Sequence, residues 1–121
     1  MNAARVVGLL WLLASSLLDA AGHPCSQSAE IVDTCFDVHG RLSFWNGAPS
    51  ARIWRVGTSR MLGIHHDELP VELASQMTTF DTEAWGDFRV CPFTKERPGH
   101  MQMVCIVSWR NIRFRERTKG E

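Results

Sequence analysis

The densest group of potential metal ligands in this sequence is His65-His66-Asp67-Glu68. Zinc, copper and nickel ions can bind neutral imidazole and carboxylate groups. Neighbouring side chains on an extended chain point to opposite sides, so at most two of these four could share one ion. The sequence therefore predicts a solvated turn here, and metal binding by His65 and His66 is the alternative.

A second candidate metal site depends on where the chain is cut during export. The residues before His23 have the features of a secretory signal peptide: a basic Arg5, an apolar run over 6–18, and small residues at Ala20 and Gly22. That run is shorter than the ~20 residues that cross a bilayer, which disfavours an uncleaved membrane anchor. Since we find no second hydrophobic span after it, we expect no stable membrane insertion after cleavage. A cut after Gly22 would make His23 the new N-terminus, whose amine and imidazole together can chelate copper.

All four cysteines, Cys25, Cys35, Cys91 and Cys105, lie after the expected signal peptide. An even number of cysteines in an oxidising compartment predicts two disulfides, and no pair has the close Cys-x-x-Cys spacing that zinc sites usually show. Two arrangements fit the strand pattern. Cys91 and Cys105 flank a predicted hairpin and could pair, which leaves Cys25 for Cys35; alternatively, Cys35 pairs with Cys91, because both fall on the polar side of their strands.

Tryptophan is the remaining candidate for ligand binding. By strand parity Trp45 falls on the polar side of its strand, where an indole can stack on a sugar or a peptide. No serine lies in a Gly-x-Ser-x-Gly turn, and the cysteines are expected to be paired, so we predict no catalytic residues. The sequence predicts a protein that is not an enzyme and needs no cofactor, unless a metal binds at the histidines.

Composition narrows the class of partner. The 121 residues include 13 Lys+Arg and 13 Asp+Glu, so the net charge is zero, whereas a nucleic-acid-binding protein needs a basic excess to neutralise phosphates. We therefore expect a protein, peptide or glycan partner and no nucleic acid. The expected organisation is a signal peptide over 1–22, an N-terminal extension over 23–34, one domain over 35–116 and a charged tail over 117–121.

The domain reads as a series of short strands. Apolar Phe36, Val38 and Leu42 alternate with polar residues, which is the pattern of a strand with one buried face. Residues 65–82 read instead as a long crossover in which Pro70 opens a short helix. Strands are predicted over 35–45, 51–56, 60–64, 85–93, 101–109 and 111–115. This pattern predicts an all-β fold, a small antiparallel β-sandwich.

Several turn motifs resemble those of a known family. Gly40-Arg41-Leu42, followed by Asn46-Gly47-Ala48-Pro49 and a strand, is similar to the opening hairpin of transthyretin-like and carboxypeptidase-regulatory-like sandwiches. Gly86-Asp87-Phe88 and Pro98-Gly99-His100 are similar to their later strands. The resemblance spans residues 36–115 and implies a prealbumin-like sandwich. The enzyme of that superfamily ends in Tyr-Arg-Gly-Ser, but this chain has no tyrosine, so the resemblance implies a binding protein.

The sequence thus predicts an exported small β-sandwich protein with a binding or structural role in the periplasm or the extracellular space. The alternative is an exported copper- or zinc-binding protein that uses His23, or His65 and His66.

Overall fold

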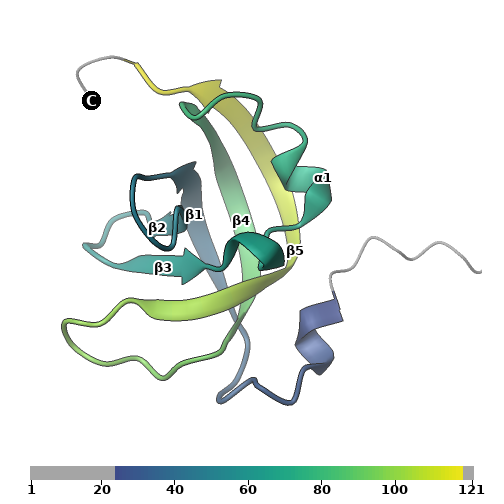
Figure 1. The fold of residues 1–121 in the computed structure, drawn as a ribbon, viewed down its shortest axis with the longest axis vertical. Helices are drawn as coiled ribbons and strands as arrows, with labels where there is room; N and C mark the ends of the chain where they lie inside the picture. Colours follow the sequence, from purple (N-terminus) through teal and green to yellow (C-terminus); the bar gives the residue numbers. More distant parts are fainter. Residues whose placement is uncertain (1–23, 119–121) are drawn as a thin grey trace, which may run out of the picture.

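The computed structural model describes residues 24–118. Figure 1 shows long strands curled around one another, with the short helix α1 beside them. The strands are β1 (Phe36–Phe44), β2 (Ala51–Arg55), β3 (Met61–Ile64), β4 (Thr82–Pro92) and β5 (Gln102–Glu116). The helical segments are the 3₁₀ turns η2 (Pro24–Gln27) and η3 (His66–Glu68) and the helix α1 (Val71–Ala74). Among these residues no helix has the length and hydrophobicity needed to span a membrane.

The strands close into a barrel in the order β1-β2-β3-β5-β4, and β4 pairs with β1. All neighbouring strands are antiparallel except β3 and β5, which are parallel. The all-β prediction is confirmed, but the expected two-sheet sandwich is not what forms. Each strand therefore has two neighbours, and the short parallel pairing of Leu62 and Gly63 with Gln102 and Met103 closes the barrel. A five-stranded Greek-key barrel of this kind resembles the OB-fold.

The strands predicted over 101–109 and 111–115 are one continuous strand, β5. Trp85 of β4 faces Arg113 of β5, whereas Asp87 faces Arg110, so β5 holds an extra residue in a β-bulge. Within the bulge Asn111 adopts a φ of 57°, in the left-handed region that asparagine tolerates better than most residues. The bulge shifts the alternation of side chains, which explains why the sequence reads as two strands here.

The barrel interior holds one apolar core, and the connection from β3 to β4 contributes to it. Pro70 precedes α1, as the sequence predicted, and Leu73 of this helix and Met77 after it are buried against the strands. The buried core residues are Val38, Leu42, Ala51, Ile53, Leu62, Ile64, Leu73, Met77, Ala84, Phe88, Val90, Val104 and Ile106.

A second, smaller core lies outside the barrel, where η2 and the residues after it cover β4 and β5. Its buried members are Cys25, Cys91 and Cys105. The disulfides are Cys25–Cys105 and Cys35–Cys91, so the predicted Cys91–Cys105 and Cys25–Cys35 pairs are wrong and the alternative Cys35–Cys91 pair is confirmed. Although Cys91 and Cys105 face each other in the β4–β5 register, each bonds to a cysteine from the segment that covers it.

Candidate functional site

The candidate metal ligands His65 and His66 are not grouped with other potential metal-binding side chains in the described residues. His65 precedes η3 and His66 begins it, and both are exposed. Within residues 24–118, no three His, Cys, Asp or Glu side chains are grouped in a way that could hold a metal ion. His23 and the expected signal peptide lie outside the described residues. The structure therefore gives His65 and His66 no third ligand of these types from that part of the chain.

Trp45 lies just after β1, and its side chain is half-buried instead of fully exposed to solvent. Its indole Nε1 donates a hydrogen bond to Ser43 Oγ at 3.0 Å. The guanidinium groups of Arg52 and Arg117 lie over its ring, at 5.4 Å and 5.9 Å from the centroid. Trp45 is thus one end of a larger set of arginine and tryptophan side chains.

The rest of this set follows the strand register across the outside of the barrel. Trp54 of β2, Arg41 of β1 and Trp85 of β4 form one row, because Arg41 is paired with both tryptophan positions. The Arg41 guanidinium lies 4.8 Å from the Trp54 ring and 5.6 Å from the Trp85 ring. The Arg115 guanidinium also lies over Trp85, at 5.3 Å from its ring centroid. We call these residues the arginine–tryptophan surface: Arg41, Trp45, Arg52, Trp54, Trp85, Arg115 and Arg117.

One buried carboxylate, Glu83, lies within this surface and is only 1% exposed. It accepts hydrogen bonds from Trp85 Nε1 at 3.1 Å, Arg115 Nε at 3.2 Å and Arg117 Nε at 3.3 Å. Arg41 Nε lies 3.8 Å from Glu83 Oε2. Burial by itself raises the pKa of Glu83, but the hydrogen bonds and the Arg41 charge outweigh it and hold the pKa below its usual 4.5. Glu83 therefore stays ionised and anchors the guanidinium groups.

A pocket opens beside this surface where the bulge of β5 faces Gly86. A Cβ atom at Gly86 would lie 2.5 Å from Ile112 Cδ1 and 2.9 Å from the Asn111 carbonyl oxygen, so the strands approach this closely only because residue 86 is glycine. The pocket has a volume of about 430 Å³. We call it the bulge pocket; it is lined by His39, Trp85, Gly86, Asn111, Arg113, Phe114 and Arg115.

A hydrogen-bonded network forms one wall of the bulge pocket. His39 Nδ1 lies 2.9 Å from Asp87 Oδ1, and Asn111 Nδ2 donates to Asp87 Oδ2 at 3.0 Å. The hydrogen bonds from Asn111 and His39 hold the pKa of Asp87 below its usual 3.8. Because an ionised carboxylate only accepts hydrogen bonds, His39 Nδ1 carries the proton and Nε2 is directed away from Asp87.

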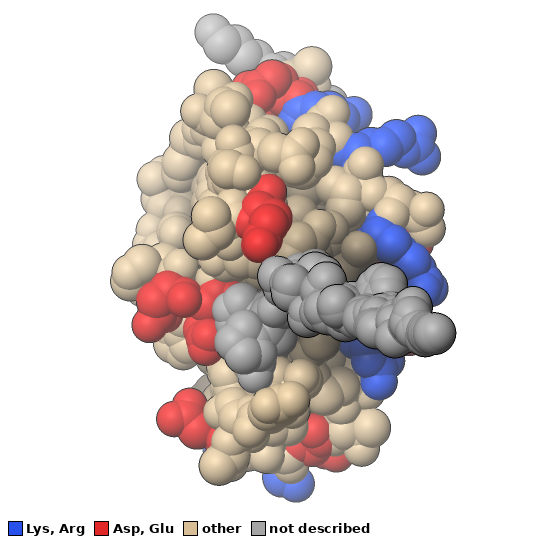
Figure 2. Space-filling model, turned by 90° about the vertical axis from the view of Figure 1, so that its right-hand side faces the viewer, with Lys and Arg blue, Asp and Glu red and all other residues tan. Residues whose placement is uncertain are grey.

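Arg113 supplies the pocket with a positive charge that has no partner among residues 24–118. It is exposed, and it makes no hydrogen bond or ion pair with the residues that the structure describes. Figure 2 shows that lysine and arginine side chains gather along one edge of the visible face, while acidic side chains lie mostly toward the other. The bulge pocket therefore combines a half-buried indole, an unpaired guanidinium, an imidazole and an amide.

No family model, curated protein or solved structure matches this chain. The resemblance to transthyretin-like proteins therefore stays a prediction.

The sequence predicted one residue of the arginine–tryptophan surface, Trp45, but none of the bulge pocket. Two signals for that pocket were present. Gly86 interrupts an apolar strand pattern, which indicates a bulge or a close approach of another backbone, and the alternation slips at Asn111. The sequence alone could not predict that Gly86 and Asn111 lie opposite each other, because this requires the β4–β5 register.

Proposed function

We propose that this chain is an exported binding protein and that the bulge pocket, with the adjoining arginine–tryptophan surface, binds an acidic polysaccharide. The proposal includes removal of residues 1–22 and a secreted or periplasmic location. Two disulfides support export, because such bonds form and persist in oxidising compartments. The proposed role is binding without catalysis.

Local charge favours an anionic ligand although the whole chain is neutral. Glu83 and Asp87 are the carboxylates at the pocket and the surface, and both are already hydrogen-bonded within the protein. The guanidinium groups outnumber them; these are Arg41, Arg52, Arg113, Arg115 and Arg117. Guanidinium groups form strong, often bidentate hydrogen bonds with carboxylates. The observation that carries the proposal is Arg113, which is unpaired within residues 24–118, beside Trp85.

The other groups in the pocket suit a sugar ring. The half-buried indole of Trp85 lines the pocket, where its apolar carbon atoms can contact the C–H groups of a sugar. Asn111 and His39 can exchange hydrogen bonds with hydroxyl groups. The volume of about 430 Å³ falls within the range of small-molecule pockets. OB-type barrels include oligosaccharide-binding proteins, although this is an analogy of fold alone.

The proposal is tested by titrating the processed, oxidised protein with polygalacturonate oligosaccharides and, separately, with neutral dextran. We expect heat of binding and a change in tryptophan fluorescence with the acidic polymer only, and weaker binding at higher salt. Replacing Arg113 by alanine should weaken binding by roughly 10- to 100-fold, because a hydrogen bond to a charged group contributes about 1.5–3 kcal/mol.

The matched control is Arg89→Ala, which removes an exposed arginine of β4 that is paired with Asp37 outside the pocket. It should bind like the wild-type protein. Absence of binding to polygalacturonate, or equal weakening by both substitutions, would show that the pocket is not the site.

A further inference from the structure

Methionine side chains gather on a different part of the barrel exterior. Within residues 24–118 there are four methionines, and only Met77 lies in the core. The other three are half-buried: Met61 begins β3, Met101 directly precedes β5 and Met103 is the second residue of β5. A flexible thioether on the surface is accessible to a ligand in a way that a core methionine is not.

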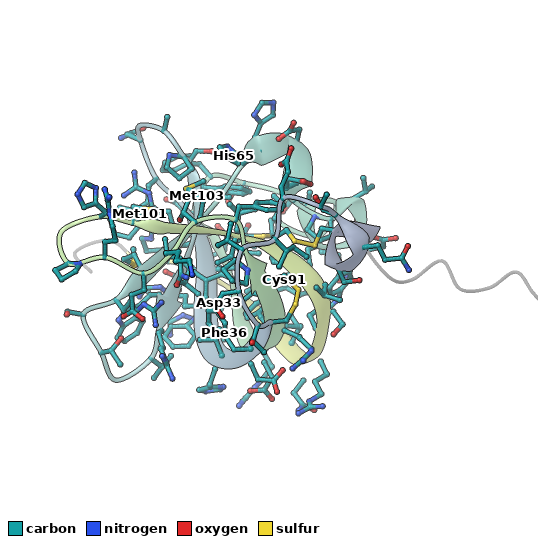
Figure 3. All side chains as sticks on the ribbon, turned by 90° about the horizontal axis from the view of Figure 1, so that it is seen from below. Asp33, Phe36, His65, Cys91, Met101 and Met103 are labelled. Carbon is teal, nitrogen blue, oxygen red and sulfur yellow. A yellow bond between two sulfur atoms is a disulfide. The ribbon has the colours of Figure 1, made fainter. Side chains whose placement is uncertain are left out.

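Two of the sulfur atoms converge over the buried backbone of Gly63, where the ring of Pro49 also packs. Gly63 is paired with Met103 in the parallel β3–β5 ladder. A Cβ atom at Gly63 would lie 2.7 Å from Met103 Sδ and 2.8 Å from Met101 Sδ, so both sulfurs lie directly over this glycine. Figure 3 shows Met101 and Met103 as neighbours on this side of the molecule. Glycine inside a strand often marks a place where a ligand approaches the backbone closely.

A third thioether borders the same place. Met61 lies two residues before Gly63, on the same side of β3, because side chains along a strand alternate. Met61 and Met101 line one hollow of about 610 Å³ between β3 and the loop that leads into β5. Met61 and Met101 thus share this hollow, and Met101 and Met103 share the space over Gly63, so Met101 connects the three side chains.

From this convergence of thioethers over Gly63 we propose a binding site for a soft monovalent metal ion, Cu(I) or Ag(I). Met101 and Met103 are the principal ligands and Met61 supplies the third. Thioether sulfur selects soft ions such as Cu(I) over zinc, calcium or magnesium. No free cysteine competes in residues 24–118, because all four are in disulfides. This site is independent of the polysaccharide proposal, since it uses other residues and another ligand.

The experiment uses Ag(I) as the probe, because Cu(I) has to be kept reduced and a reductant would attack the disulfides. The processed protein is labelled with ¹³C at the methionine methyl groups and titrated with silver nitrate in a chloride-free buffer. We expect the methyl signals of Met61, Met101 and Met103 to shift and to saturate at one equivalent, while the Met77 signal stays in place. A titration in which these three signals do not move would overturn the proposal without any variant.

Variants then assign the ligands. The double substitution Met101→Leu and Met103→Leu nearly conserves side-chain volume and should abolish binding, whereas Met77→Leu is the matched control and should retain it. Circular dichroism and the melting temperature confirm that each variant is folded. A double variant that binds Ag(I) like the wild-type protein, or binding that is lost instead in the His65→Ala/His66→Ala variant, contradicts a thioether site.

Discussion

The β4–β5 strand pair has two halves that carry opposite kinds of surface. Around Cys91 and Cys105 the outer side is apolar, covered by the N-terminal segment and cross-linked to it. From Ser108 onward the outer residues of β5 are polar or charged, the strand bulges at Asn111, and the bulge pocket is open. A single pair of strands can therefore anchor the chain at one end and present a ligand site at the other.

The difference arises from side-chain parity. Both parities of residues 102–107 are largely buried, one inside the barrel and the other beneath the covering segment. After residue 108 the exposed residues of β5 include Arg110, Arg113 and Arg115, and an arginine cannot be buried without a partner. Glu83 partners the arginines near it, but Arg113 faces the pocket with no partner among the described residues. The covered half is therefore stabilised by buried apolar side chains, whereas the open half presents a charged surface to solvent.

The largest effect is expected at the covered half. Replacing Cys25 and Cys105 together by serine should lower the free energy of unfolding by about 2–5 kcal/mol, because this bridge closes a loop over 80 residues of sequence separation. The measurement is urea unfolding followed by tryptophan fluorescence. Polysaccharide binding at low denaturant should persist in the fraction that remains folded. An unchanged unfolding midpoint would show that the covered half does not act as the anchor.

The next largest effect is expected from closing the bulge pocket at Gly86. The substitution Gly86→Ala places a Cβ atom 2.9 Å and 3.0 Å from the carbonyl oxygens of Asn111 and Arg110, which are backbone atoms that cannot easily move. We expect a loss of about 1–3 kcal/mol in stability, as for other overpacked sites, together with loss of binding. Ser108→Ala, at an exposed position of the neighbouring strand β5, should change neither. A stable Gly86→Ala variant would contradict the close approach at the bulge.

Glu83 combines features of both halves, because it is a buried side chain and it carries a charge within the open surface. The substitution Glu83→Gln removes the charge that three arginines surround and should destabilise the protein by about 1–3 kcal/mol. Its pKa in the folded state lies below the usual 4.5, so its stabilisation is complete above about pH 4.5 and is lost as the pH falls through the lower, folded value.

Unfolding measured from pH 7 to pH 2 therefore tests Glu83 directly. Glu83→Gln should show a smaller acid-induced loss of stability than the wild-type protein. Glu96→Gln is the control, because that carboxylate is largely exposed in its ion pair with Arg60. If both variants follow the wild-type pH dependence, Glu83 does not have the role described here.

The sequence predicted local features well and long-range pairings poorly. Alternation placed β1 within one residue at each end, and Pro70 indicated α1. The barrel was missed because the parallel β3–β5 pairing joins segments that are far apart and has no local pattern. For the same reason the cysteine pairing required the register, since continuing the β1–β4 ladder by one residue places Cys35 opposite Cys91.

The smallest effect on stability is expected at the residue that matters most for binding. Arg113→Ala removes an exposed side chain without a partner among the described residues, so the free energy of unfolding should change by less than about 0.5 kcal/mol. Binding of polygalacturonate should nevertheless fall as given above. A stability loss as large as that of Glu83→Gln would place Arg113 in the structural network instead.

An NMR titration of the tryptophan indole N–H signals with polygalacturonate oligosaccharides tests the proposed site directly. We expect the Trp85 signal, in the bulge pocket, to shift most and the signal of Trp109, which packs against the core, not to shift. A titration in which Trp109 moves as far as Trp85, or in which no indole signal moves, would contradict an acidic polysaccharide site at the bulge of β5.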